Sequence, residues 1–174
     1  MKILFCNVGS TSLKYRLFEM NGRETTLAEG RQERVGAPLG AWAHRKAGEP
    51  QQKRSLPIAG YAEGIALMQE ALLDGTLGSM EELDCVAFKV VHAKSVTGVQ
   101  LLDERVLAAM AAFNTVAPSH NPPYIEAIRR FRTALPQTPL VGSFETGFHA
   151  TMPPEAYLYS IPIGVSRQYG IRRY

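Results

Sequence analysis

A polar break near the start of the chain holds residue types that bind phosphate and magnesium. The apolar run at residues 2–6 gives way to the segment NVGSTS. Gly9 lets the backbone approach a ligand closely, and Ser10 and Ser12 add hydroxyl groups. Asn7 offers a neutral oxygen to a hydrated Mg²⁺. The segment lacks the GxxxxGK[ST] pattern of a P-loop, so it suits either a phosphate-binding turn or a plain connection between strands.

A lysine lies within a second apolar segment, and a glutamate directly follows a third. Lys89 interrupts DCVAFKVVH at residues 84–92, where a buried ammonium group is costly unless an anion meets it. The alternative is a position from which Lys89 reaches solvent at a strand edge. Glu145 closes the segment PLVGSF, and α/β sheets place ligand groups at such strand ends. Glu145 therefore suits either a Mg²⁺ ligand or a cap on the following turn.

The histidines and cysteines point to no other chemistry. His120 and His149 both suit structural hydrogen bonding, and no Ser/His/Asp or Cys/His arrangement has the context of a hydrolase. Cys6 and Cys85 lie in apolar segments without the spacing of a metal site. We expect both cysteines to be buried, reduced thiols.

The elements that must position these groups follow from the apolar periodicity. Residues 2–6, 13–17 and 25–32 predict three strands in an antiparallel meander, and Asn21-Gly22 is a strong hairpin signal between the last two. Residues 36–57 read as a Gly/Pro-rich basic loop. The remaining predictions are helices over 61–73, 103–113 and 121–134, strands over 84–92, 139–144 and 157–163, and the start of a helix within 166–169. This order favours an α/β fold with a mixed sheet and flanking helices.

Composition and charge narrow the class of protein. The chain has 174 residues, 45% of them hydrophobic and 20% charged, which is typical of one globular domain. A net charge of +3 is too small to predict nucleic-acid binding, and the basic segment at 44–54 reads as a solvated loop. The apolar runs are too short for a membrane span, and the first residues do not resemble a signal peptide. We therefore expect a cytoplasmic protein with no membrane and no nucleic-acid partner.

Six segments in order resemble the successive motifs of acetate kinases, which form the acetokinase family of the actin/sugar-kinase/Hsp70 superfamily. They are NVGSTSLKY at 7–15, FKVVH at 88–92, APSHNP at 117–122, FETGFH at 144–149, TMP at 151–153 and IRRY at 171–174. The resemblance extends over essentially the whole chain. It implies a ribonuclease H-like, actin-like ATPase domain that forms the N-terminal half, residues 1–174, of a family member. It also implies that the C-terminal nucleotide-binding domain of the family, with a transition-state histidine, lies outside this chain.

The resemblance implies reversible phosphoryl transfer between ATP and a short carboxylate, from acetate to acetyl phosphate, with Mg²⁺. Such a site must bring two negative partners into line while metal and cationic groups offset the charge of the transferred phosphoryl group. The family also implies a homodimer for the full-length enzyme. The implied residues are Asn7 for the metal, Gly9, Ser10, Ser12 and Lys14 for ATP, Lys89, Val91 and His120 for the carboxylate or acyl phosphate, and Glu145 as the catalytic carboxylate.

Four places depart from the family pattern. Lys89 stands where the family usually has Arg, and Glu145 where it usually has Asp. Lys keeps the charge of Arg but cannot form its bidentate hydrogen bonds to a carboxylate or phosphate, and Glu is one methylene longer than Asp. Ala93-Lys94 replaces a Gly-Gly pair, and Ser119 replaces a Leu. These changes support an alternative function, a truncated and catalytically inactive ligand-binding or interaction module of the same fold. For the kinase itself, we expect no turnover by the isolated 174-residue chain.

Overall fold

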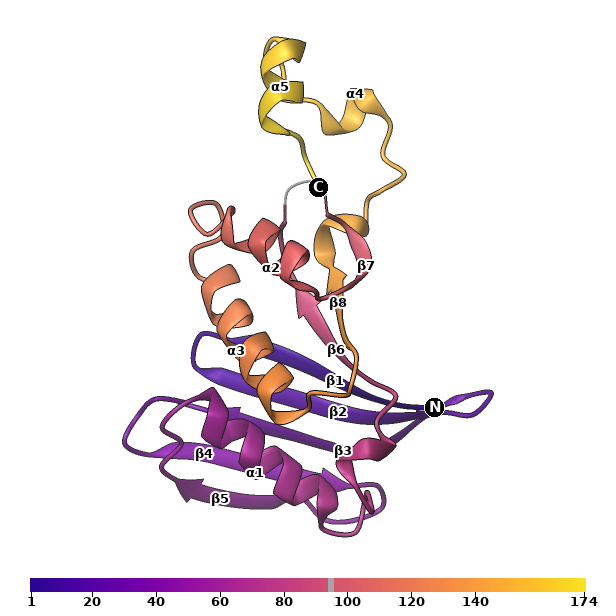
Figure 1. The fold of residues 1–174 in the computed structure, drawn as a ribbon, viewed down its shortest axis with the longest axis vertical. Helices are drawn as coiled ribbons and strands as arrows, with labels where there is room; N and C mark the ends of the chain where they lie inside the picture. The colour runs from indigo at the N-terminus through magenta and orange to yellow at the C-terminus, as the bar shows by residue number, and fades with distance from the viewer. Residues whose placement is uncertain (94–95) are drawn as a thin grey trace.

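The computed structural model describes residues 1–93 and 96–174 of the chain. Within these residues, the centre of the fold is one mixed sheet of eight strands (Figure 1). Their order across the sheet is β5-β4-β3-β2-β1-β6-β8-β7. The bounds are β1 (Lys2–Gly9), β2 (Ser12–Met20), β3 (Glu24–Glu33), β4 (Gly40–Lys46), β5 (Gln52–Leu56), β6 (Cys85–Val90), β7 (Gly98–Leu101) and β8 (Leu140–Phe144).

Helices cover one face of this sheet and extend beyond one of its ends. Both α1 and α3 lie across the same face, and α4 and α5 project past the sheet near the C-terminus (Figure 1). The bounds are α1 (Tyr61–Leu73), α2 (Glu104–Ala111), α3 (Asn121–Ala134), α4 (Pro154–Tyr157) and α5 (Ile163–Tyr169). None of the helices in the described residues combines the length and the apolar character needed to cross a bilayer.

The sheet joins an antiparallel half to a parallel half. Strands β1 to β5 form a continuous antiparallel meander, and β1, β6 and β8 run parallel to one another. Parallel neighbours need crossover connections, which the segments containing α1 and α3 supply. The carboxyl ends of β1, β6 and β8 therefore lie together at one edge of the sheet.

Strand alternation separates a buried face from an open one. On β1, Leu4, Cys6 and Val8 are buried, while the residues between them are half-buried. Phe88 of β6 faces the same side and meets Phe131 of α3 edge to face, with ring centroids 5.0 Å apart. The apolar core thus fills the space between the sheet and its helices, and the alternate residues stand on the opposite face.

The predicted helix starts and the central strands are confirmed. The carboxylate of Asp103 accepts a hydrogen bond of 2.8 Å from the backbone N–H of Val106, as an N-cap should. Pro122 and Pro123 lie in the first turn of α3, where a missing N–H costs nothing. The strands predicted at 84–92 and 139–144 are β6 and β8, and the early meander is present.

Three local predictions are wrong. The segment 36–57 is not a loop, because it forms β4, a tight turn and β5. The exposed residues of β5 carry no apolar period, and the strand exists because it pairs with β4. The segment 157–163 is not a strand: α4 ends at Tyr157, and Pro162, whose ring fixes φ, precedes α5. The sequence also missed β7, and Cys85 is half-buried rather than buried.

A polar cluster is buried beneath the β4–β5 hairpin. The side chain of His44 is 2% exposed, and its Nδ1 lies 2.9 Å from the hydroxyl of Tyr15. Trp42 stacks on the same imidazole with ring centroids 5.9 Å apart. Burial lowers the pKa of His44 below 6.5, and the nearby Lys46 ammonium acts in the same direction.

We predict that mild acid weakens the fold. The unfolded chain binds a proton on His44 more tightly than the folded chain does, so stability is lost as the pH falls below 6.5. Burial lowers the pKa of His92 as well, which adds to the same trend. The free energy of unfolding in urea should therefore be lower at pH 5.5 than at pH 7.5. The difference should shrink in His44→Gln, and an equal difference in both proteins would contradict this account.

We also predict opposite effects for two glycine substitutions. A Cβ on Gly30 would lie 2.2 Å from Cζ of Tyr15, so Gly30→Ala must displace the buried ring and should cost about 1–3 kcal/mol. A Cβ on Gly164, inside α5, meets nothing within 4 Å. Gly164→Ala should therefore stabilise the fold by about 0.5–1 kcal/mol. Urea denaturation of both variants checks this pair, and a neutral Gly30→Ala would refute it.

Candidate functional site

Sheet pairing brings three of the sequence-predicted residues, Lys14, Asn7 and Lys89, into one row across neighbouring strands. Asn7 of β1 pairs directly with Lys14 of β2. Cys6 pairs with Phe88, so Asn7 and Lys89, the next residue on each parallel strand, lie at the same level. Because Cys6 and Phe88 both face the helices, Asn7 and Lys89 both stand on the open face. Neighbouring strands are about 4.8 Å apart, which places these polar groups within reach of one small ligand.

Lys89 meets an anion at the end of this row. Its Nζ lies 2.9 Å from Oε1 of Glu145, and the two side chains are 37% and 52% exposed. Glu145 begins a 3-10 turn directly after β8, and β8 pairs with β6. The hydrogen bond that the Lys89 ammonium donates to Glu145 raises the pKa of Lys89 above its ordinary value. Both sequence interpretations of Lys89 hold in part, because it has a carboxylate partner and also reaches solvent.

A tyrosine of α1 holds the turn between β1 and β2 in place. Gly9 and Ser12 are the last paired residues on either side of the turn. The hydroxyl of Tyr61, at the start of α1, donates a hydrogen bond to the carbonyl of Gly9. A Cβ on Gly9 would lie 2.6 Å from Oγ of Ser12, so a side chain at this position would displace the Ser12 hydroxyl. Tyr61 was not predicted from the sequence, because nothing in a helical pattern shows which loop a tyrosine reaches.

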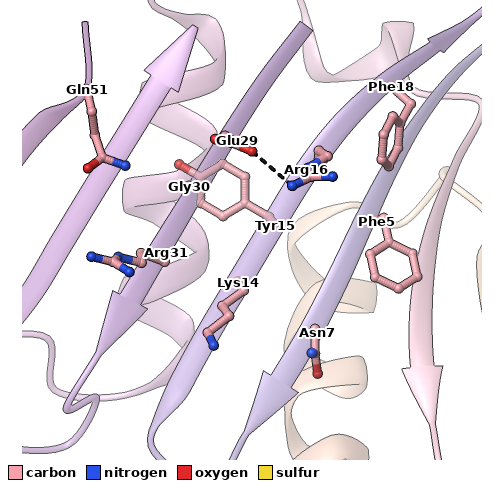
Figure 2. Close-up of a pocket in the computed structure, with 10 residues that line it drawn as sticks. All are labelled: Phe5, Asn7, Lys14, Tyr15, Arg16, Phe18, Glu29, Gly30, Arg31 and Gln51. Atoms are coloured by element: carbon pink, nitrogen blue, oxygen red, sulfur yellow. Dashed lines mark ion pairs between the residues drawn. The ribbon is translucent and has the colours of Figure 1, made fainter. Parts of the chain in front are cut away.

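A hollow of about 600 Å³ opens on the face of the sheet away from the helices. Figure 2 shows Asn7 and Lys14 side by side in it, with Arg31 on the next strand. Phe5 and Phe18 supply its apolar wall. The lining residues are Phe5, Asn7, Lys14, Tyr15, Arg16, Phe18, Glu29, Gly30, Arg31 and Gln51.

The charges beside this hollow are partly neutralised within the protein. Glu29 forms ion pairs with Arg16 at 3.1 Å and with Arg45 at 2.5 Å. Arg31 lies 3.9 Å from Glu33, a loose and exposed ion pair. Positive charge therefore remains available around Lys14.

The start of α3 contributes a second group of side chains. His120 is exposed just before the helix, and its ring stacks on Tyr124 with centroids 6.2 Å apart. Tyr124 is buried, and burial raises the pKa of its hydroxyl. The charges of Lys89 and Glu145 act on that pKa in opposite directions. The sequence analysis missed Tyr124, which looked like one more apolar residue of the helix.

The segment after β6 carries the remaining predicted residues. Val91 follows the strand and is half-buried. His92 stacks on Phe113 at 4.8 Å and meets the ring of Tyr174 edge to face at 4.9 Å. Ala93 forms a bridge with Val96. Lys94, which replaces a glycine of the family pattern, lies outside the described residues.

The donor set fits magnesium better than a transition metal. Asn7 and Glu145 offer amide and carboxylate oxygens, the ligand type that Mg²⁺ prefers. Within residues 1–93 and 96–174 there is no group of three or more His, Cys, Asp or Glu that could hold a metal. Mg²⁺ commonly keeps several waters and binds through one or two carboxylates plus substrate phosphate. The residues therefore fit a magnesium ion that arrives with a phosphate ligand.

The chain is similar in sequence to acetate kinases. The acetate kinase of Thermosipho melanesiensis is 39% identical over 178 residues, and that of Thermoanaerobacter pseudethanolicus is 41% identical over 179 residues. The matches span 100% of this chain and 43% and 44% of those proteins. The chain thus covers less than half the length of these relatives.

Solved structures show the same fold. A crystal structure of Porphyromonas gingivalis acetate kinase matches with a TM-score of 0.88 at 28% identity, and a propionate kinase from Francisella tularensis matches with 0.87 at 27%. Each match covers 99% of this chain and 44% of the other. The mixed sheet with its flanking helices is therefore half of an actin-like ATPase, as predicted. The acetokinase family model matches residues 2–174, and the chain belongs to the acetokinase family.

Proposed function

We propose that this chain forms the N-terminal half of an enzyme that transfers a phosphoryl group between ATP and a short carboxylate, interconverting acetate and acetyl phosphate. The observation that carries the proposal is the accessible Lys89–Glu145 ion pair at the carboxyl ends of the parallel strands. It lies in the same row as Asn7 and Lys14. The row offers a cation to an anionic substrate and oxygens to a metal in one place.

The side of the row at β6 and β8 suits the carboxylate. The ammonium of Lys89 would bind and orient the carboxylate, or the acyl phosphate in the reverse direction. When bound, Mg²⁺ would offset the charge of the phosphoryl group in transfer, held by oxygens of Asn7 and Glu145. Val91 and His120 would line the space beside the substrate, and Ser119 would make that space more polar than a leucine would.

The opposite side of the row suits the nucleotide phosphates. The backbone N–H groups of the turn that begins at Gly9, with the hydroxyls of Ser10 and Ser12, would face the phosphate chain. Lys14 would neutralise part of its charge. Tyr61 would hold the turn in place through its hydrogen bond to the Gly9 carbonyl.

The proposal extends to the whole polypeptide. ATP and ADP, a small carboxylate and its acyl phosphate are the proposed ligands, and magnesium is the proposed cofactor. We further propose a homodimeric, cytoplasmic enzyme. The relatives at 39% and 41% identity, named as acetate kinases, support the proposed activity.

A catalytically inactive binding module is the second candidate. The observation in its favour is that Glu145 already neutralises Lys89, the cation that a substrate would need. Such a module would bind a carboxylate or a nucleotide without phosphoryl transfer.

We predict that the full native polypeptide forms acetyl phosphate from acetate and ATP, trapped as a hydroxamate. Lys89→Met removes the hydrogen bond from a charged donor to the substrate, which is worth about 1.5–3 kcal/mol, so kcat/KM for acetate should fall about 10- to 150-fold. Arg105→Met, which removes an exposed cation of α2, should leave kcat/KM unchanged. Equal rates for all three proteins would contradict the assignment of Lys89.

The same assay separates the two candidates. An inactive module gives no product in the native protein and gains activity when Lys89→Arg and Glu145→Asp restore the family residues. Product formation by the native protein, with an unchanged or lower rate in this double variant, would exclude the module.

A further inference from the structure

We propose that Lys89 and Glu145 form an exchange pair, in which an anion binding to Lys89 releases Glu145 for a divalent cation, and the cation likewise releases Lys89. Each side chain is the counter-ion of the other while the site is empty. This inference rests on the proposed function for the identity of the two ligands. Its consequence is that the carboxylate substrate and magnesium bind with positive coupling through one ion pair of this chain.

The geometry makes the pair a switchable contact rather than a structural one. Nζ and Oε1 are 2.9 Å apart, so each group occupies the site that a ligand of the other would take. Both side chains are more than one-third exposed, so ligands from solvent reach either group. An exposed ion pair is worth little, so ligands break it at small cost. A fully buried pair would resist exchange, because its separation leaves an unpaired charge in the interior.

The surroundings leave both partners at the accessible end of their strands. Lys89 stands in the row with Asn7 and Lys14, on the open face of the sheet. Glu145 begins a short turn at the end of β8, one residue beyond the last pairing with β6. The two strands hold the backbones in register while the ends of both side chains move apart.

Reciprocity gives the proposal a quantitative form. An anion that binds Lys89 must break the Lys89–Glu145 ion pair, and so must a cation that binds Glu145. The free-energy cost is therefore the same for either ligand alone. Removing Glu145 should therefore raise the affinity for the anion by the same factor by which removing Lys89 raises the affinity for the cation. With both ligands present the cost is met once, so each ligand raises the affinity of the other.

Isothermal titration of this chain with acetate alone and with MgCl₂ alone tests the proposal. Glu145→Gln should bind acetate about two- to fivefold more tightly than the native chain in the absence of metal, the range that exposed ion pairs allow. Lys89→Met should bind Mg²⁺ more tightly by the same factor in the absence of acetate. In the native chain, saturating Mg²⁺ should raise the acetate affinity, and Glu145→Gln should lose this effect. Glu155→Gln, which removes an acidic group of α4, should match the native chain throughout.

Three results would overturn the exchange pair. They are unchanged acetate affinity in Glu145→Gln, unequal factors for the two variants, and an effect of Mg²⁺ on acetate that persists in Glu145→Gln. Chemical denaturation of each variant verifies that the fold is intact. Phosphoryl transfer by the full polypeptide together with any of these results rejects the exchange pair and keeps the proposed function. Coupled binding without phosphoryl transfer rejects the proposed function and keeps the exchange pair.

Discussion

The parallel pairing of β1, β6 and β8 is the constraint on which the site depends. These strands come from distant parts of the chain, and their register brings Asn7 level with Lys89 and lets Glu145 return to it after β8. A slip of one residue in either pairing would turn Lys89 into the apolar core and Phe88 onto the open face. The contact between Phe88 and Phe131 opposes such a slip, so packing on one face fixes the chemistry on the other.

One face of the sheet forms the apolar core, and the other carries the polar side chains of the candidate site. The face beneath α1 and α3 holds nearly all the large buried side chains and supplies the stability. The open face carries exposed cations and the hollow beside Asn7 and Lys14. Polar side chains at the site are exposed enough to exchange one partner for a ligand. The same exchange in the core would leave a buried polar group without a partner, at a high cost in free energy. A half-exposed ion pair such as Lys89–Glu145 is thus compatible with a stable fold and a responsive site.

Much of this arrangement was predictable because local patterns and global pairing agree. Asp103 signals a cap, and the lysine inside an apolar strand signals a need for an anion. The strands β4 and β5 were hidden, because β5 has no apolar period and forms only through its neighbour. Tyr61 and Tyr124 were missed for a different reason. Their roles depend on which loop or ion pair the packing of α1 and α3 brings to them, and helical spacing carries no such information.

The central claim is that Asn7, Lys89 and Glu145 share one ligand site at the carboxyl ends of the parallel strands. Manganese substitutes for magnesium at oxygen ligands and broadens the NMR signals of nearby amides. Titrating the ¹⁵N-labelled chain with Mn²⁺ and acetate should broaden the amide signals of Asn7, Val90 and Glu145 first. The acidic turn around Glu81–Glu82 lies at the opposite, amino ends of β1 and β6. The account would be contradicted if broadening began at that turn and spared the amides of Asn7, Val90 and Glu145.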